Sequence, residues 1–89
     1  MDLFKLENPK LMEYLTDDWR TTGTIRYLME RSGETVTDGL LSDLLRLKTE
    51  GVVESQYKRY PTPDEIRRYS GAPLQFRLTE LGKAAKKNA

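Results

Sequence analysis

The stretch TVTDGLLSDLLRLKTEGVVE, residues 35–54, decides the fold that this sequence predicts. Its apolar residues recur at helical spacing, and they are Val36, Leu40, Leu41, Leu44, Leu45 and Leu47. This periodicity predicts an amphipathic helix over residues 36–50 that begins with a capping-box-like pattern from Thr35 to Asp38. Gly51 is expected to end the helix, because glycine readily adopts the left-handed conformation found there. Val52 and Val53 then begin a strand.

The opposite side of this helix is polar and carries Thr37, Asp38, Gly39, Ser42, Asp43 and Arg46. Hydroxyl and guanidinium groups on one exposed helix face suit contact with base edges and phosphates. Two acids on such a face are unfavourable beside a polyanion. Asp38 is better explained as an acid that stabilises the helix N-terminus.

Further elements flank this helix on both sides. Asn8 and Pro9 start a helix predicted over 9–18, with Leu11, Leu15 and Trp19 along its stripe. A second helix is predicted over 23–32, with Thr22 as its cap. Strand-forming residues occupy 52–60 and 74–78, with a short helix expected at 63–69 between them, and a last helix over 79–87 that begins at Thr79.

Composition excludes several classes of protein. The chain has 89 residues, enough for one domain over 1–89, and it contains neither cysteine nor histidine. The commonest general base, the commonest metal ligands and any disulfide are therefore missing, so we expect no enzyme, no metal and no cofactor. No apolar run approaches the roughly 20 residues of a membrane span, and the N-terminus lacks the pattern of a signal peptide. These features favour a cytoplasmic protein.

The charge is distributed unevenly along the chain. Residues 1–56 carry a net charge of −4 and residues 57–89 a net charge of +5, which together give the overall +1. A basic end can mark a surface that faces a polyanion, or it can be an ordinary solvated surface with a lysine-rich tail.

Three local patterns resemble a winged helix-turn-helix domain. They are the helix pair in TGTIRYLMERSGETVTDGLLSDLLRL, the exit LLRLKTEGVV, and the segment FRLTELGKA at 76–84, which is similar to the return strand and helix start of MarR-type and PadR-type regulators. The resemblance covers about residues 9–85. It implies an α+β fold with a three-helix core, a two-stranded β-hairpin wing over 52–78 and a short C-terminal helix. The chain lacks the long dimerisation helices of those regulators.

The resemblance further implies sequence-specific binding of double-stranded DNA by a transcriptional regulator. The helix over 36–50 would lie in the major groove, and the basic wing would lie on the backbone or in the minor groove. The residues expected at this interface are Thr22, Thr24, Thr37, Asp38, Gly39, Ser42, Arg46, Lys58, Arg59, Arg67 and Arg68.

A winged helix can also serve as a protein–protein interaction module without reading DNA, and this is the alternative. Leu41 and Leu45 are expected to cover the base of the wing, and their exposure would favour a protein partner. We also expect a homodimer, because Leu3, Phe4 and Leu6 at one end and Leu81, Ala84 and Ala85 at the other have no evident place in a three-helix core.

Overall fold

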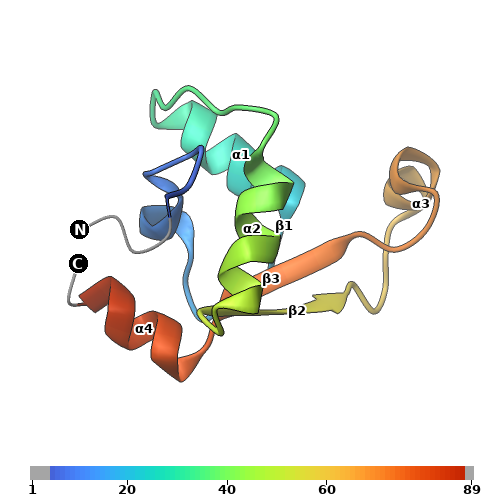
Figure 1. Ribbon diagram of the computed structural model, residues 1–89. Coiled ribbons are helices and arrows are strands. Elements are labelled where there is room, and N and C mark those ends of the chain that lie inside the picture. Colours follow the sequence, from blue (N-terminus) through green and yellow to red (C-terminus); the bar gives the residue numbers. More distant parts are fainter. Residues whose placement is uncertain (1–4, 88–89) are drawn as a thin grey trace.

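The computed structural model describes residues 5–87, which form an α+β fold (Figure 1). In chain order its elements are the 3-10 turn η1 (Leu11–Tyr14), strand β1 (Arg20–Thr21), helices α1 (Thr22–Arg31) and α2 (Leu40–Thr49), strand β2 (Val53–Tyr57), helix α3 (Pro63–Tyr69), strand β3 (Leu74–Leu78) and helix α4 (Glu80–Lys87). The predicted α+β class is confirmed. The order of elements from the second predicted helix onward is also as expected.

The sheet is antiparallel, with its three strands in the order β1-β3-β2. The long hairpin pairs Val53 with Leu78 and Tyr57 with Leu74. The short strand β1 adds the pair between Arg20 and Phe76 on the other side of β3. The sequence did not predict β1, because two residues are too few to show an alternating pattern. The sheet therefore has one strand more than the predicted two-stranded wing.

The first predicted helix, over 9–18, is wrong, because only the turn η1 forms within that range. Asn8 does not cap a helix there, since its side chain bonds to Thr37 and Asp43 instead. The backbone at Leu15 is extended. The backbone carbonyls of residues 14, 15 and 16 also accept hydrogen bonds that are not helical. Their donors are, in that order, the Arg20 guanidinium group, the Lys86 ammonium group and the Leu78 amide. Tertiary hydrogen bonds have thus replaced the helical ones.

Helix α1 lies within one residue of its predicted range, and its cap is Thr21 rather than Thr22. The Thr21 hydroxyl accepts a hydrogen bond from the Thr24 amide at 3.2 Å. Gly33 follows the helix with a φ of 89°, the left-handed conformation expected of a terminating glycine. Gly51 after α2 likewise has a φ of 78°, which confirms the predicted end of that helix.

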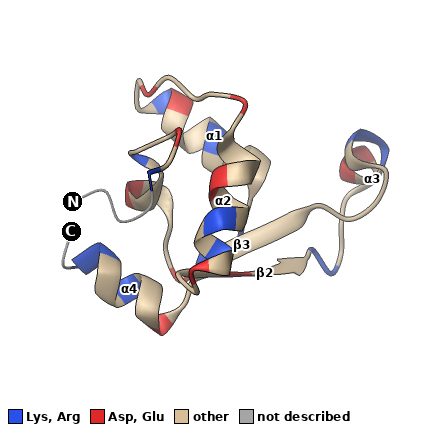
Figure 2. Cartoon of the chain, in the orientation of Figure 1, with Lys and Arg blue, Asp and Glu red and all other residues tan. Residues whose placement is uncertain are grey.

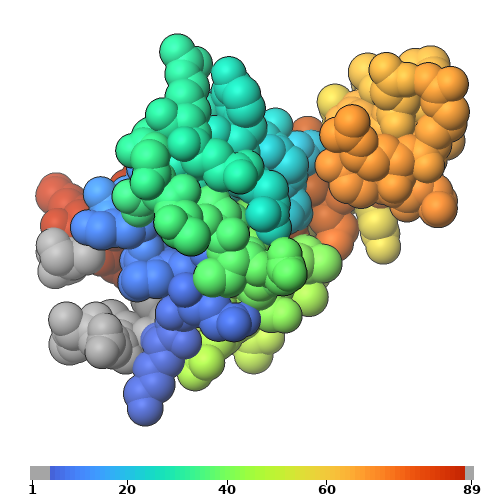
Figure 3. Space-filling model, turned by 90° about the horizontal axis from the view of Figure 1, so that it is seen from above, coloured from blue at the N-terminus to red at the C-terminus, as the bar shows by residue number. Residues whose placement is uncertain are grey.

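The hairpin carries α3 at its tip, at one end of the molecule (Figures 1 and 3). The amide of Lys58 donates to the carbonyl of Pro73 at 2.8 Å, next to the pair of Tyr57 with Leu74, where the strands end and the tip begins. Helix α3, at its predicted position, begins with a complete capping box in which Thr62 and Glu65 bond to each other's backbone amides. No residue of α3 is buried. The projecting hairpin contributes to the elongated extents of 40 × 27 × 18 Å.

Helix α4 is attached to the corner between α2 and β2 through Thr79. The Thr79 hydroxyl donates to the Gly51 carbonyl at 2.6 Å and accepts from the Gly82 amide at 3.0 Å. Gly82 packs directly against the backbone, since a Cβ there would lie 1.9 Å from the carbonyl oxygen of Val52. This contact explains the Thr-x-x-Gly spacing in the segment FRLTELGKA.

The core lies between α1, α2 and the sheet. Its buried side chains are Leu11, Leu15, Ile25, Met29, Leu40, Leu44, Leu47, Val52, Val53, Phe76 and Leu78. The leucines of the segment TVTDGLLSDLLRLKTEGVVE thus divide into two groups, with Leu40, Leu44 and Leu47 inside and Leu41 and Leu45 outside. Over the described range, 5–87, none of the helices has both the length and the apolar character to cross a membrane.

Candidate nucleic-acid interface

The solvent-facing side of α2 carries Leu41, Ser42, Leu45, Arg46, Lys48 and Thr49, all of them exposed. Figure 2 shows basic residues on this helix, which lies in front of β3 in the view of Figure 1. Ser42 and Arg46 are four residues apart and lie on one side of the helix, as predicted. Among residues 5–87, Arg46 and Lys48 make no ion pair with a carboxylate. Their charges are therefore available to an external anion.

Asp43 does not belong to this face, and the expectation that it faces a groove is wrong. Asp43 is only 4% exposed, and its carboxylate accepts hydrogen bonds from the backbone amides of Glu7 and Asn8 at 3.0 and 2.8 Å. A third bond comes from the Asn8 side-chain amide at 3.0 Å. Asp43 therefore fastens the N-terminal segment to α2. Removing it from the solvent face leaves no acid among the exposed residues of α2 itself.

Thr37, Asp38 and Gly39 lie before the helix and not on it, because α2 begins at Leu40 and not at residue 36. The Thr37 hydroxyl accepts bonds from the Asn8 side chain and from the Gly39 amide. The N-cap of α2 is Gly39, which lies beyond Thr35 and Asp38, so the capping box predicted from those two residues does not form. Asp38 is exposed in this loop, outside the first turn in which it was expected. The loop is held by the Asn8 side chain, which the sequence assigned to a different helix.

The N-terminus of α1 places hydroxyl groups beside the wing. The hydroxyls of Thr21 and Thr24 are hydrogen-bonded to each other at 3.0 Å. Of the two threonines predicted to contact DNA here, Thr22 and Thr24, the hydroxyl of Thr24 is therefore already bonded within the protein. Thr22 is half-buried in the first turn. Tyr69 of α3 lies over this turn, since a Cβ on Gly23 would be 3.0 Å from the Tyr69 hydroxyl. The wing tip therefore rests on α1 at a glycine, a contact that the sequence did not reveal.

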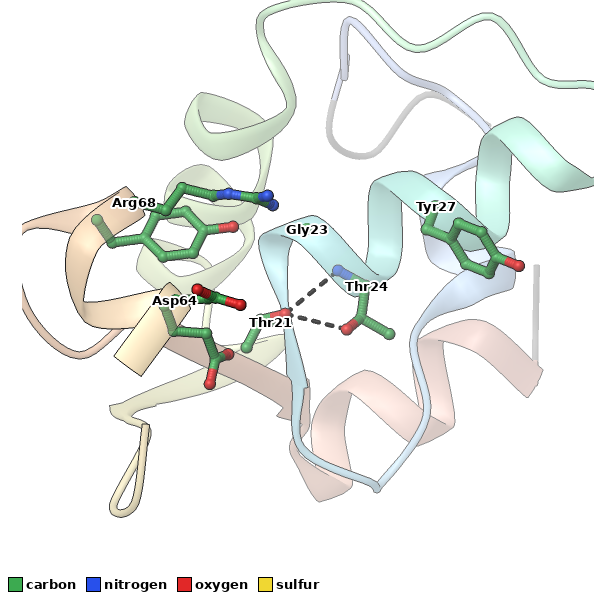
Figure 4. Close-up of a pocket in the computed structure, with 8 residues that line it drawn as sticks. Thr21, Gly23, Thr24, Tyr27, Asp64 and Arg68 are labelled. Carbon is green, nitrogen blue, oxygen red and sulfur yellow. Dashed lines mark hydrogen bonds between the residues drawn. The ribbon is translucent and has the colours of Figure 1, made fainter. Parts of the chain in front are cut away.

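A hollow of about 310 Å³ lies between α1 and α3 (Figure 4). From α1 and its cap it is lined by Thr21, Gly23, Thr24 and Tyr27, and from α3 by Asp64, Glu65, Arg68 and Tyr69. Arg68 and the threonine hydroxyls are suited to an anion, whereas Asp64 and Glu65 oppose one. The hollow thus has mixed charge.

Of the four predicted basic residues of the wing, two are paired with carboxylates and two are not. Lys58 contacts Glu65 at 2.8 Å, and Arg67 is paired with Asp64 on the surface of α3. Arg59 lies over the ring of Tyr60 at 5.9 Å, and within residues 5–87 neither Arg59 nor Arg68 has a carboxylate partner. Lys58 also lowers the pKa of Glu65 below its ordinary value, aided by the hydrogen bond from the Thr62 amide. The acids of α3 therefore offset two of the four cations.

Leu41 and Leu45 do not cover the base of the wing, because each is 43% exposed. At the other end of the molecule Leu81 of α4 is also exposed, as is Ala84, whereas Leu6 packs against the core. Leu3 and Phe4, the other apolar residues of the predicted dimer contact, lie outside the described residues. In the part of the chain from 5 to 87, no group of three or more acidic, histidine or cysteine side chains is arranged to hold a metal ion.

Comparison of the chain with protein-family models, with curated proteins and with solved structures finds no match.

Proposed function

We propose that the protein binds double-stranded DNA sequence-specifically, as a transcriptional regulator with a winged helix fold. The fold proposal is supported by the strand order β1-β3-β2, by the position of α1 and α2 between β1 and β2, and by the long β2–β3 hairpin. In this arrangement α2 is the recognition helix and the hairpin with α3 is the wing.

The observation that carries the proposal is the composition of the exposed face of α2. Ser42 and Arg46 lie on it, Lys48 adds a second cation, and Asp43 is turned into the protein. A face with hydroxyl and guanidinium groups and without acids suits a major groove, where arginine pairs with guanine and serine with several acceptors. Two acids on this face were the main objection to DNA binding. One of them is now buried and the other lies before the helix.

In this proposal the wing and the start of α1 contact the phosphate backbone. Arg59 and Arg68 supply charge from the wing, while Thr22 and the first amides of α1 supply hydrogen-bond donors. Lys58 and Arg67 contribute less, because each is paired with a carboxylate. Two half-sites contacted by a homodimer would give the base contacts that one small domain lacks.

The test is fluorescence anisotropy with labelled random duplexes over a series of salt concentrations, followed by selection of the bound sequences. We expect Arg46→Ala to weaken binding to a selected site by about 1–3 kcal/mol and binding to random DNA by less. Arg31→Ala is the matched control, since it removes an exposed arginine at the far end of α1. Equal weakening of all duplexes by both variants would exclude base reading by α2.

A protein-docking function is the second candidate, and the exposure of Leu41 and Leu45 favours it. Exposed apolar groups on a helix often mark a protein contact. If no duplex binds even at low salt, docking becomes the better explanation of this face. Sedimentation of the protein alone would then report whether the partner is a second copy.

A further inference from the structure

Leu41 and Leu45 form an apolar pair on the outer face of α2. They are four residues apart, so they lie one above the other, and each is 43% exposed. They do not pack in the core, because Leu40, Leu44 and Leu47 occupy the buried face of the same helix. Two large apolar side chains are thus exposed to solvent on the outer face of α2.

Polar and cationic groups surround this leucine pair. With 100° of rotation per residue, Ser42 and Thr49 lie next to the leucine pair, on the side of α2 that points farthest from the core. Arg46 and Lys48 lie on opposite edges of this exposed face. The Thr49 hydroxyl donates to the carbonyl of Leu45 at 3.1 Å and is thereby engaged by the helix itself. The pair is therefore a narrow apolar strip between two cations.

This pattern fits the floor of a major groove better than it fits a protein. The flanking cations complement phosphates on both sides of a groove, whereas a protein interface generally buries about 800 Å² on each partner and depletes lysine from its centre. The only apolar group on a base edge in the major groove is the C5-methyl of thymine. Leucine cannot donate or accept a hydrogen bond, so a methyl group is the one base feature that it can recognise.

We propose that Leu41 and Leu45 read thymine methyl groups, so that the preferred DNA site places A·T pairs beside the base contacted by Arg46. This inference rests on the proposed DNA binding and adds to it the class of sequence that is bound. Leu41 and Leu45 add to the specificity that Arg46 provides by its base contact, while Lys48 and the wing supply the attraction to the backbone.

The experiment replaces each thymine of a selected duplex in turn by deoxyuridine, which lacks only the methyl group. We expect about a four-fold loss of affinity at each position that a leucine contacts, equivalent to about 0.8 kcal/mol for a buried group of that size. Leu41→Ala and Leu45→Ala are each expected to lower affinity for the thymine duplex. Each variant is also expected to abolish the response to deoxyuridine at its own position. Ile66→Ala, which removes an exposed apolar side chain from α3, is the control and should keep the response.

The outcomes separate this inference from the proposal beneath it. Selected sites that bind tightly but respond to no deoxyuridine would overturn methyl reading and leave sequence-specific DNA binding intact. Binding of all duplexes with equal affinity would overturn both methyl reading and base recognition. A failure to bind any duplex would overturn DNA binding together with the inference. Circular dichroism of the leucine variants checks that these exposed positions leave the fold unchanged.

Discussion

Replacing Asp43 by alanine tests the most unexpected contact in the molecule. The carboxylate accepts three hydrogen bonds, from the amides of Glu7 and Asn8 and from the Asn8 side chain, at 2.8–3.0 Å. Asn8 is itself only 2% exposed, so water cannot readily replace the lost acceptor. Asp43→Ala therefore leaves the buried Asn8 backbone amide without a partner, reduces the Asn8 side-chain amide to its bond with Thr37, and frees the partly exposed Glu7 amide.

The expected loss of stability follows from these contacts. A hydrogen bond to a charged acceptor contributes about 1.5–3 kcal/mol, and a buried donor left unsatisfied costs about 1–3 kcal/mol. Counting only the two bonds to Asn8, we expect Asp43→Ala to lower the free energy of unfolding by about 3–5 kcal/mol. This is a large part of the roughly 5–10 kcal/mol typical of a domain of this size. The melting temperature would fall by about 15–30 °C.

Urea unfolding, followed by circular dichroism and by the fluorescence of Trp19, the single tryptophan, measures this change. Asp38→Ala is the control, because that exposed acid lies close by in sequence and is expected to change stability by less than about 0.5 kcal/mol. A loss below about 1 kcal/mol for Asp43→Ala would refute the buried network. At a temperature where the variant is folded, we expect its affinity for duplex DNA to be unchanged. A ten-fold loss there would return Asp43 to the DNA interface.

Three further changes test other parts of the structure. Gly82→Ala is expected to destabilise the protein by about 3 kcal/mol in urea unfolding, because the new Cβ would overlap the carbonyl of Val52; a loss under 1 kcal/mol would contradict that close approach. Acidification is expected to loosen α3 before the core. The folded pKa of Glu65 lies below the usual 4.5, so its carboxylate stabilises the fold above pH 4.5 and loses this effect as the pH falls through the folded pKa. Amide exchange around Glu65 between pH 5 and pH 3 would report the local opening, and an opening free energy that does not change with pH would exclude the effect. Arg68→Ala is expected to weaken binding to all duplexes and to reduce the salt slope by about 1, whereas Arg67→Ala, which removes a paired arginine, changes the slope less; equal effects would show that the ion pair on α3 is unimportant.

The parts of the fold that the sequence predicted are those governed by local signals. Gly33 and Gly51 end their helices in the left-handed conformation, and Thr62 and Pro63 start α3 where expected. Alternation in residues 74–78 located β3. In each case the deciding interaction lies within a few residues of the signal.

The parts that the sequence missed depend on contacts between distant residues. Asn8 has the sequence context of a helix cap, yet its side chain bonds to residues 29 and 35 positions away. Asp43 occupies a polar position on the helical wheel, but a neighbouring segment buries it. Tyr69 meets Gly23 only because the hairpin folds back toward α1. No pattern confined to one element can reveal such partners.

Helix α3 is built mainly from local interactions, although its Tyr69 lies over Gly23 of α1. It buries no residue and completes its own cap, and the bond from Lys58 to Pro73 ties the chain together where the tip begins and ends. A short turn in place of residues 59–72 would span the same two points, and because closing a shorter loop costs less conformational entropy, loop closure does not oppose the exchange. Hairpin tips of different length and charge could therefore be grafted onto one core, and under the proposed function such grafts would vary backbone contact separately from base reading.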